Sequence, residues 1–314
     1  MLGGSTAEDL AGRTLARVIG GSGEPMFRLM GDGPLGVLRN LNLTSLRDPG
    51  GAGSEQLIRV LDGGLWQIDD CDVRASNLFG FYAYTDGGVV EVNRLTGAGC
   101  PGGEIVITGE NTTFTFSQVG TEAEPIYYNH EVQTIGAPPN TISFSGECWI
   151  TNLQVASFLA DVSVIGDGVN PIHVNRQINI GGIGTMDTTV RGALYTQDTP
   201  PAYVGNFFDI ICPGVVRFEG CTLDTQMGLI RLQTVDRIIE VGQRIIFDGG
   251  SFTEAIAIRG IGRVDFDNGV AGPAVGDWLT IDGVAYGGQI PAVEIYVDTV
   301  LQTTLTGVGQ SWSP

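Results

Sequence analysis

The sequence predicts an all-β protein built as a solenoid, a parallel β-helix, and three observations favour this class. Glycine supplies 48 of the 314 residues, roughly twice its usual share, without the G-X-Y period of collagen. Short runs of alternating apolar and polar residues stop repeatedly on a glycine corner. After residue 35, hardly any stretch shows the 3.6-residue period of an amphipathic helix.

The strand-forming runs resemble one another. Each reads apolar, any residue, apolar, polar and then a glycine corner, at 58–64, 142–148, 216–221, 245–250 and 264–269. Imperfect repeats of about 20 to 30 residues predict coils that stack on one another. The side chains expected to point inward hold equivalent positions in these units: Val60, Phe144, Phe218, Phe247 and Phe266.

A β-sandwich or β-barrel is the alternative fold. Strands in those folds are also joined by glycine-rich turns, and the spacing of the units here is irregular. In either case the β region is expected to span residues 35–271 as one domain.

Residues 1–34 differ from the rest and are expected to form a small arm. Thr6 and Asp9 imitate a capping box, and the stretch 10–19 could form a short helix that stops at Gly20. A glycine- and proline-rich connector follows. The arm could attach the chain to another protein, and the alternative is a terminal helix that packs on its own domain.

Residues 272–314 are expected to form a small antiparallel β module. A hairpin is predicted about Asp282-Gly283, and 292–297 alternates as a strand. Such a module could cap the solenoid, whose last strands would otherwise expose an open edge. It carries only negative side-chain charge, because Arg263 is the last basic residue.

The charge excludes several classes of partner. All 16 basic residues are arginine, set against 35 acidic residues and a net charge of −19. Affinity for phosphate backbones and anionic membranes comes from clustered positive charge, so neither nucleic acid nor a membrane is an expected partner. The start of the chain shows no secretory signal and no run of 18 apolar residues occurs, which predicts a soluble protein made in a cytoplasm.

The five cysteines form no C-x-x-C pair and are odd in number. A chain of this length does not need disulfide bonds for stability, so buried free thiols are the expected state.

Two histidines, without H-E-x-x-H spacing, are too few for a typical zinc site. Gly166-Asp167-Gly168 alone is weak evidence for calcium, and the nucleotide-binding motifs are absent. The sequence therefore predicts neither a metal site nor a cofactor.

One carboxylate cluster is a candidate catalytic site. In the stretch 68–74, strand alternation would place Asp70 and Asp72 on one face with Arg74 beside them, and Asp69 opposite. A pair of carboxylates could act as general acid and base on a glycosidic bond. The alternative is a solvated acidic face, which a chain with 35 acidic residues would form by chance.

Aromatic residues lie close to this cluster in the sequence. Exposed rings beside polar groups suit sugar binding, and a core role is the alternative for most of them. The candidate binding residues are Trp66, Asp69, Arg74, Tyr82 and Tyr84.

The repeated units from about residue 35 to 270 resemble the pectin-lyase-like right-handed parallel β-helix, which occurs in polysaccharide-degrading enzymes and in bacteriophage tailspikes and tail fibres. Enzymes of that family often carry an Asp-Asp pair with Gly-His-Gly and Arg-x-Lys, or calcium-binding Asp residues with a catalytic Arg or Lys. Asp69-Asp70 matches the first element, and the other two are missing because the chain lacks both Gly-His-Gly and lysine.

The organisation is similar to that of the phage proteins: a short N-terminal segment, a β shaft and a small C-terminal β module. The resemblance implies a homotrimeric virion structural protein for host attachment. Residues 1–34 would contact other virion proteins, and the shaft could contact host-surface glycan. The alternatives are a polysaccharide hydrolase or lyase with Asp70 and Asp72 as its acid and base, and a capsid decoration protein.

Overall fold

The structure, a computed structural model, is all-β, as predicted. Every regular element among the described residues is a strand. The structure describes residues 7–8, 14–16, 27–30, 36–44, 56–61, 63–76, 78–132, 140–157, 162–181, 188–191, 194–197, 208–211, 215–225, 230–234, 244–259, 262–283, 290 and 292–314.

The strands form three sheets, in which almost all neighbouring strands are parallel. The 12-stranded sheet contains, in spatial order, β4 (Gly36–Arg39), β7 (Leu65–Asp69), β10 (Val89–Asn93), β13 (Thr113–Ser117), β15 (Asn140–Ser145), β17 (Val162–Ile165), β19 (Thr188–Arg191), β22 (Val215–Glu219), β25 (Arg244–Asp248), β28 (Gly262–Asp267), β30 (Val293–Val297) and β31 (Val300–Leu305).

The main path of the 15-stranded sheet contains β3 (Phe27–Met30), β6 (Gln56–Leu61), β9 (Phe79–Asp86), β12 (Gly103–Glu110), β14 (Ile126–Val132), β16 (Cys148–Ser157), β18 (Pro171–Gly181), β21 (Phe208–Ile211), β24 (Ile230–Thr234), β27 (Ile256–Arg259), β29 (Leu279–Gly283) and β32 (Ser311–Trp312). Its side branch contains β20 (Leu194–Gln197), β23 (Thr222–Thr225) and β26 (Ser251–Phe252). The five-stranded sheet contains β1 (Ala7–Glu8), β2 (Thr14–Ala16), β5 (Leu41–Thr44), β8 (Asp72–Arg74) and β11 (Thr96–Ala98).

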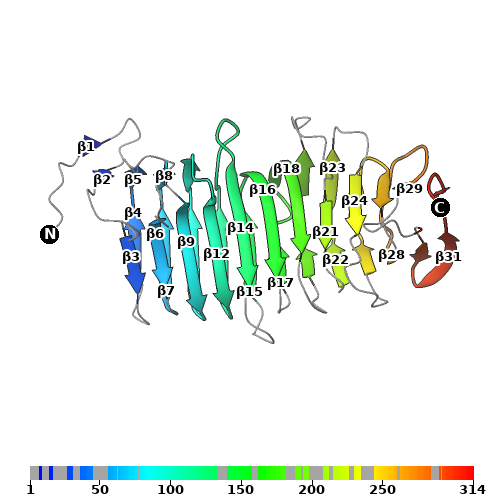
Figure 1. The fold of residues 1–314 in the computed structure, drawn as a ribbon, viewed down its shortest axis with the longest axis horizontal. Coiled ribbons are helices and arrows are strands. Elements are labelled where there is room, and N and C mark those ends of the chain that lie inside the picture. The colour runs from blue at the N-terminus through cyan, green and yellow to red at the C-terminus, as the bar shows by residue number, and fades with distance from the viewer. Residues whose placement is uncertain are drawn as a thin grey trace.

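Up to β12 the chain visits the three sheets in turn, and from β13 onward the described strands belong to the two long sheets alone. It passes through β7, β8 and β9, and then through β10, β11 and β12, which lie beside them in the same three sheets. We call each such pass a coil. The strands line up in a row from the N-terminus to the C-terminus, so the molecule is elongated (Figure 1). Within the described ranges, no sheet closes on itself.

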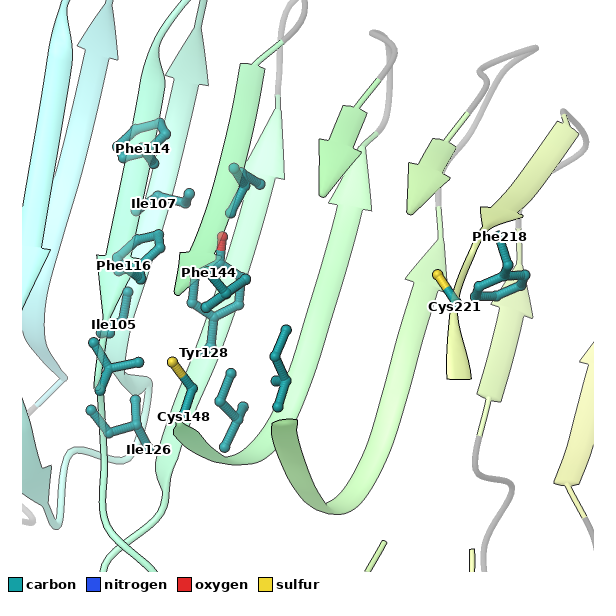
Figure 2. Packing of buried hydrophobic residues seen from close by; sticks show 14 of the residues in the cluster. Ile105, Ile107, Phe114, Phe116, Ile126, Tyr128, Phe144, Cys148, Phe218 and Cys221 are labelled. Carbon is teal, nitrogen blue, oxygen red and sulfur yellow. The ribbon is translucent and has the colours of Figure 1, made fainter. Parts of the chain in front are cut away.

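The core is a set of apolar columns that run across successive strands. Phe116 stacks on Phe144 with 5.4 Å between ring centroids, and Tyr128 meets both rings edge-on (Figure 2). Further along, Phe247 stacks between Phe218 and Phe266. Each buried phenylalanine contributes about 1.5–3 kcal/mol through its transfer from water. The predicted inward positions are confirmed, because all of them are buried: Val60, Phe144, Phe218, Phe247 and Phe266.

A corner with a left-handed backbone ends most strands of the 12-stranded sheet. Glycine takes this position at Gly146, Gly220 and Gly249, as the repeat predicts. In the N-terminal half the same position is held by residues with a side chain, at Asn40, Asp70, Arg94 and Gln118. At these four corners the N–H donates to the carbonyl of a residue in the next strand of the sheet, so the ladder continues through the corner.

The predicted N-terminal helix is wrong where the structure describes it. Thr14–Ala16 is strand β2, which pairs in parallel with β5 and antiparallel with β1. Pairing with a sheet supplies backbone partners that a short, marginal helix lacks, and this outweighs local helix propensity. The rest of the stretch 10–19 lies outside the described residues.

The C-terminal region continues the sheets before it ends them. β29 and β30 add in parallel to β27 and β28, and antiparallel strands β31 and β32 then complete the two long sheets. Asp282 and Gly283, about which a hairpin is predicted, are the last two residues of β29, and residues 284–289 lie outside the described part of the chain. Trp278 and Trp312 pack against the last core rings and so cover this end of the core.

Candidate functional site

The predicted carboxylate cluster lies at a corner between two sheets. Asp69 is the last residue of β7, and Asp70 turns the chain with a φ of 51°. Cys71 is buried in the core, and Asp72 begins β8. The turn at Asp70 interrupts the strand, so the simple alternation expected over 68–74 does not continue through it.

Asp69 and Asp70 share an arginine from the neighbouring coil. Arg94 contacts the Oδ1 of Asp69, and its Nε and Nη2 bind the two carboxylate oxygens of Asp70 at 2.6 and 2.8 Å. Arg39 adds a second ion pair to Asp69, with 2.9 Å between Nε and Oδ2. Asp69 is therefore grouped with Asp70 rather than opposite to it. These ion pairs hold the pKa of Arg94 above its ordinary value, the hydrogen bonds to Asp70 being the largest cause.

Asp72 belongs to a separate, more buried network. Its side chain is 1 % exposed, and its Oδ1 accepts a 2.6 Å hydrogen bond from the hydroxyl of Thr96. Its Oδ2 accepts from the Nε of Arg74, which confirms that Arg74 lies beside it. The Nη1 and Nη2 of Arg74 bind both carboxylate oxygens of Glu124, at 2.8 and 2.6 Å.

The Arg74 network favours the charged forms of Arg74 and Glu124. Hydrogen bonds to Glu124 and Asp72 raise the pKa of Arg74, and the Arg74 hydrogen bond lowers the pKa of Glu124. Asp70 and Asp72 thus bind different arginines, and each carboxylate oxygen of either residue already accepts a hydrogen bond. The ion pair of Asp70 joins two adjacent coils, whereas that of Asp72 lies within β8. The acid and base role of the two residues stays a prediction.

Sequence reasoning missed the partners of this cluster. Arg94 binds Asp70 and Thr96 binds Asp72, each from the equivalent position of the next coil, so the coil length was the signal that could have found them. Glu124 reaches Arg74 from a turn two coils further on, and no sequence pattern points to it.

The aromatic candidates do not gather around the carboxylates. Trp66 on β7 packs against the core and lies so close to Gly36 that a Cβ there would meet its ring at 2.3 Å. Tyr82 and Tyr84 lie on β9 in another sheet, where strand alternation directs them away from the buried Phe81 and Ala83. Tyr82 stacks on Phe79 at 5.3 Å, and Tyr84 is 52 % exposed.

The histidine and calcium candidates have structural roles where they are described. His173 stacks on Trp149 at 3.7 Å, and its Nε2 lies 3.0 Å from Oε1 of Glu147. Asp167 accepts hydrogen bonds from the backbone N–H groups of Gly146, Val169 and Asn170 and from the Asn170 amide. Although desolvation acts in the opposite direction, these bonds lower its pKa. The side chain of His130 lies outside the described set.

Buried thiols are confirmed at the four cysteines that the structure describes, Cys71, Cys100, Cys148 and Cys221. Desolvation raises the pKa of Cys100 to about 12 and that of Cys148 to about 11. Neither is therefore a thiolate at neutral pH, which excludes both as activated nucleophiles. Cys212 lies outside the described ranges.

The part of the chain that the structure describes contains no group of three or more His, Cys, Asp or Glu side chains arranged to hold a metal ion. Nor does any helix in that part have the length and apolar character needed to cross a membrane.

Comparison with known proteins finds no family model, no curated protein and no solved structure that matches this chain.

Proposed function

We propose that the three sheets are the faces of a right-handed parallel β-helix, and that this helix is the shaft of a fibre, spike or other surface projection of a phage or phage-like particle. The observation that carries the proposal is the unbroken parallel ladder from β4 to β30, with apolar columns beneath it. The helical path is supported by the return of the chain to the same sheets in each coil, three sheets up to β12 and the two long sheets from β13 onward.

The physical properties of such a rod suit a projection. Each coil contacts mainly its two neighbours, so length grows with the number of coils while the core stays equally well packed. Adjacent strands lie about 4.8 Å apart, so the 12 strands of one sheet extend over roughly 50 Å. A net charge of −19 keeps the surface soluble and repels nucleic acid.

The partners follow from the same proposal. The shaft is a homotrimer, residues 1–34 attach it to other virion proteins, and its exposed faces can contact host-surface glycan. In this function the ion pairs of Asp69 with Arg39 and of Asp70 with Arg94, and the hydrogen bond from Thr96 to Asp72, hold successive coils in register.

Analytical ultracentrifugation of the full chain tests the proposal. The expected result is the mass of a trimer with the high frictional ratio of a rod, and a compact monomer would contradict it. Antibody labelling of particles in electron micrographs then separates a projection from a capsid decoration protein. Label at tail or spike tips favours the projection, whereas label spread over the capsid shell favours decoration.

A further inference from the structure

The outer face of the 15-stranded sheet carries an unusual patch near its N-terminal end. Strand alternation puts its members on the face opposite the buried core residues of β6, β9 and β12. Arg59 pairs in register with Tyr82, and Tyr84 with Thr108. We call the patch formed by these four residues the Arg59 face.

Arg59 differs from the other arginines whose side chains are described. Each of the others forms an ion pair with a carboxylate: Arg39, Arg74, Arg94, Arg217, Arg244 and Arg263. Arg59 instead places its guanidinium carbon 5.7 Å from the ring centroid of Tyr82, and its Nε is buried without a hydrogen-bond partner. Although the chain has 35 acidic residues, Arg59 is the one arginine with a described side chain for which no ion pair is found.

The surroundings of Arg59 suit a ring-shaped, polar ligand. Tyr84, two residues beyond Tyr82 on the same face, is 52 % exposed, so its ring is open to stacking. The hydroxyl of Thr108, next to Tyr84 across the strands, is buried and has no partner. Because the Nε of Arg59 and this hydroxyl are covered by protein, a ligand on the face would contact Arg59 through its Nη1 and Nη2 groups.

We propose that the Arg59 face binds a sugar unit that carries a carboxylate, such as a uronic or sialic acid. The Nη1 and Nη2 groups of Arg59 bind the carboxylate through paired charge-assisted hydrogen bonds, and the exposed ring of Tyr84 packs against the apolar face of the sugar. This inference rests on the glycan contact in the proposed function and deepens it.

Charge on the same face sets the orientation of the ligand. Asp86 is exposed and lies at the far end of β9, four residues beyond Tyr82, or about 13 Å along the strand. The carboxylate of the sugar therefore docks at the Arg59 end, and the neutral part of the sugar extends over Tyr84 toward Asp86.

Saturation-transfer NMR on the full chain tests the proposal with three acidic probes. These are the methyl glycosides of galacturonic, glucuronic and N-acetylneuraminic acid, each compared with its neutral methyl ester. We expect at least one acid to bind while its ester does not, and added salt to weaken the binding through screening. If none of the three acids binds, or if an acid and its ester bind equally, the proposal is wrong.

Matched variants locate the site. Arg59→Gln and Tyr84→Ala should each weaken binding of the acidic sugar about tenfold or more, because each removes one of the two contacts. Arg39→Gln, which removes an exposed arginine on another sheet, should leave the affinity unchanged. Equal losses in Arg59→Gln and Arg39→Gln would show diffuse charge attraction instead of a site. Circular dichroism of each variant checks that the fold is kept.

The results also separate this inference from the proposed function. If the protein binds the acidic sugar but sediments as a compact monomer, the sugar site is supported and the proposed function as a projection is contradicted. If the protein is a rod-shaped trimer that binds none of the three acids, the proposed projection is supported and the sugar site is contradicted.

Discussion

Arg94 donates two hydrogen bonds to the carboxylate of Asp70, and both residues are left-handed corners of adjacent coils. The N–H of Asp70 also donates to the carbonyl of Asn93, just before Arg94. One corner is thus joined to the next through both backbone and side chain. Because the pair is exposed, its net contribution to the free energy of unfolding is expected to stay below about 1 kcal/mol.

Substitutions at Asp70 should therefore act mainly through the backbone. Asp70→Gly and Asp70→Val both remove the carboxylate, but valine resists the φ of 51°, so it should destabilise the protein by about 1–2 kcal/mol more than glycine. Urea unfolding of the two variants measures this difference. Equal stabilities would show that the corner is not held in the left-handed region.

The enzyme alternative is tested at the same residue. Incubation with bacterial capsular polysaccharide, followed by size-exclusion chromatography, should show any shortening of the chains. If shortening occurs, Asp70→Asn is expected to leave its rate unchanged, because the carboxylate is bound to Arg94. A loss of shortening in Asp70→Asn and in Asp72→Asn would instead support their acid and base roles.

The two carboxylates on Arg74 should differ in their contribution to stability. Asp72 is 1 % exposed, and its replacement removes the acceptor of one hydrogen bond from Thr96 and one from the Nε of Arg74. Asp72→Ala should therefore reduce the free energy of unfolding by about 2 kcal/mol. Glu124 is 39 % exposed, and Glu124→Ala should reduce it by less than about 1 kcal/mol. Urea unfolding measures both, and a larger effect at Glu124 would contradict the structure.

Acid should weaken the C-terminal half through Asp265, whose side chain is fully buried. Desolvation alone would raise its pKa, but the hydrogen bonds from Arg244 and Arg263 lower it overall. A lowered pKa contributes stability above the ordinary carboxyl value near 4, and that stability is lost as pH falls through the folded pKa.

Asp265→Asn is therefore expected to be less stable than the wild type at pH 7, with a difference that narrows as the pH falls below about 4. Thermal unfolding across this range measures the difference. Asp277→Asn, at an exposed position, is the matched control and should follow the wild type throughout. A difference at Asp265 that does not change with pH would contradict the assigned ion pairs.

The described thiols should be inert in the folded protein. Burial and a pKa of about 12 at Cys100 and about 11 at Cys148 keep both protonated at pH 8. Alkylation with iodoacetamide, read by peptide mass spectrometry, should label neither until the chain is unfolded in urea. Rapid labelling of Cys148 in the native protein would contradict its place in the core.

Trp312 should protect the C-terminal end of the core. Its ring stacks on Phe266 at 5.6 Å and meets Trp278 at 6.2 Å. Trp312→Ala is expected to lower the free energy of unfolding by about 2 kcal/mol and to increase light scattering through association of exposed ends. Trp312→Phe, which keeps a ring, should have a smaller effect on both measurements, and equal behaviour of all three proteins would exclude a capping role.

Much of the β region could be predicted from the sequence because its signals are local. Alternation identifies the inward rings of Phe218, Phe247 and Phe266, and a glycine after the strand identifies the corners at Gly220 and Gly249. Both signals depend on the geometry of a few consecutive residues. Local signals also predicted a helix at 10–19, and this was wrong at Thr14–Ala16. These residues form β2, which pairs with β5, a strand that is distant in the sequence.

The partners of the candidate site depended on the tertiary structure. The length of each coil decides which side chain meets Asp70 or Asp72, and coil lengths differ along the chain. For example, Arg244 lies opposite Arg263 in the register of β25 and β28. The next coil is longer, and there Arg263 lies opposite Glu294 in the register of β28 and β30. The absence of a carboxylate at Arg59 likewise depends on its neighbours across the sheet.

The sequence by itself determined the β class, the inward rings and the acidic charge. Only the tertiary structure decided which charges pair, and which of the described arginines has no carboxylate beside it. The physical reason is that alternation and corners are local properties of the backbone, whereas pairing is set by stacking between coils.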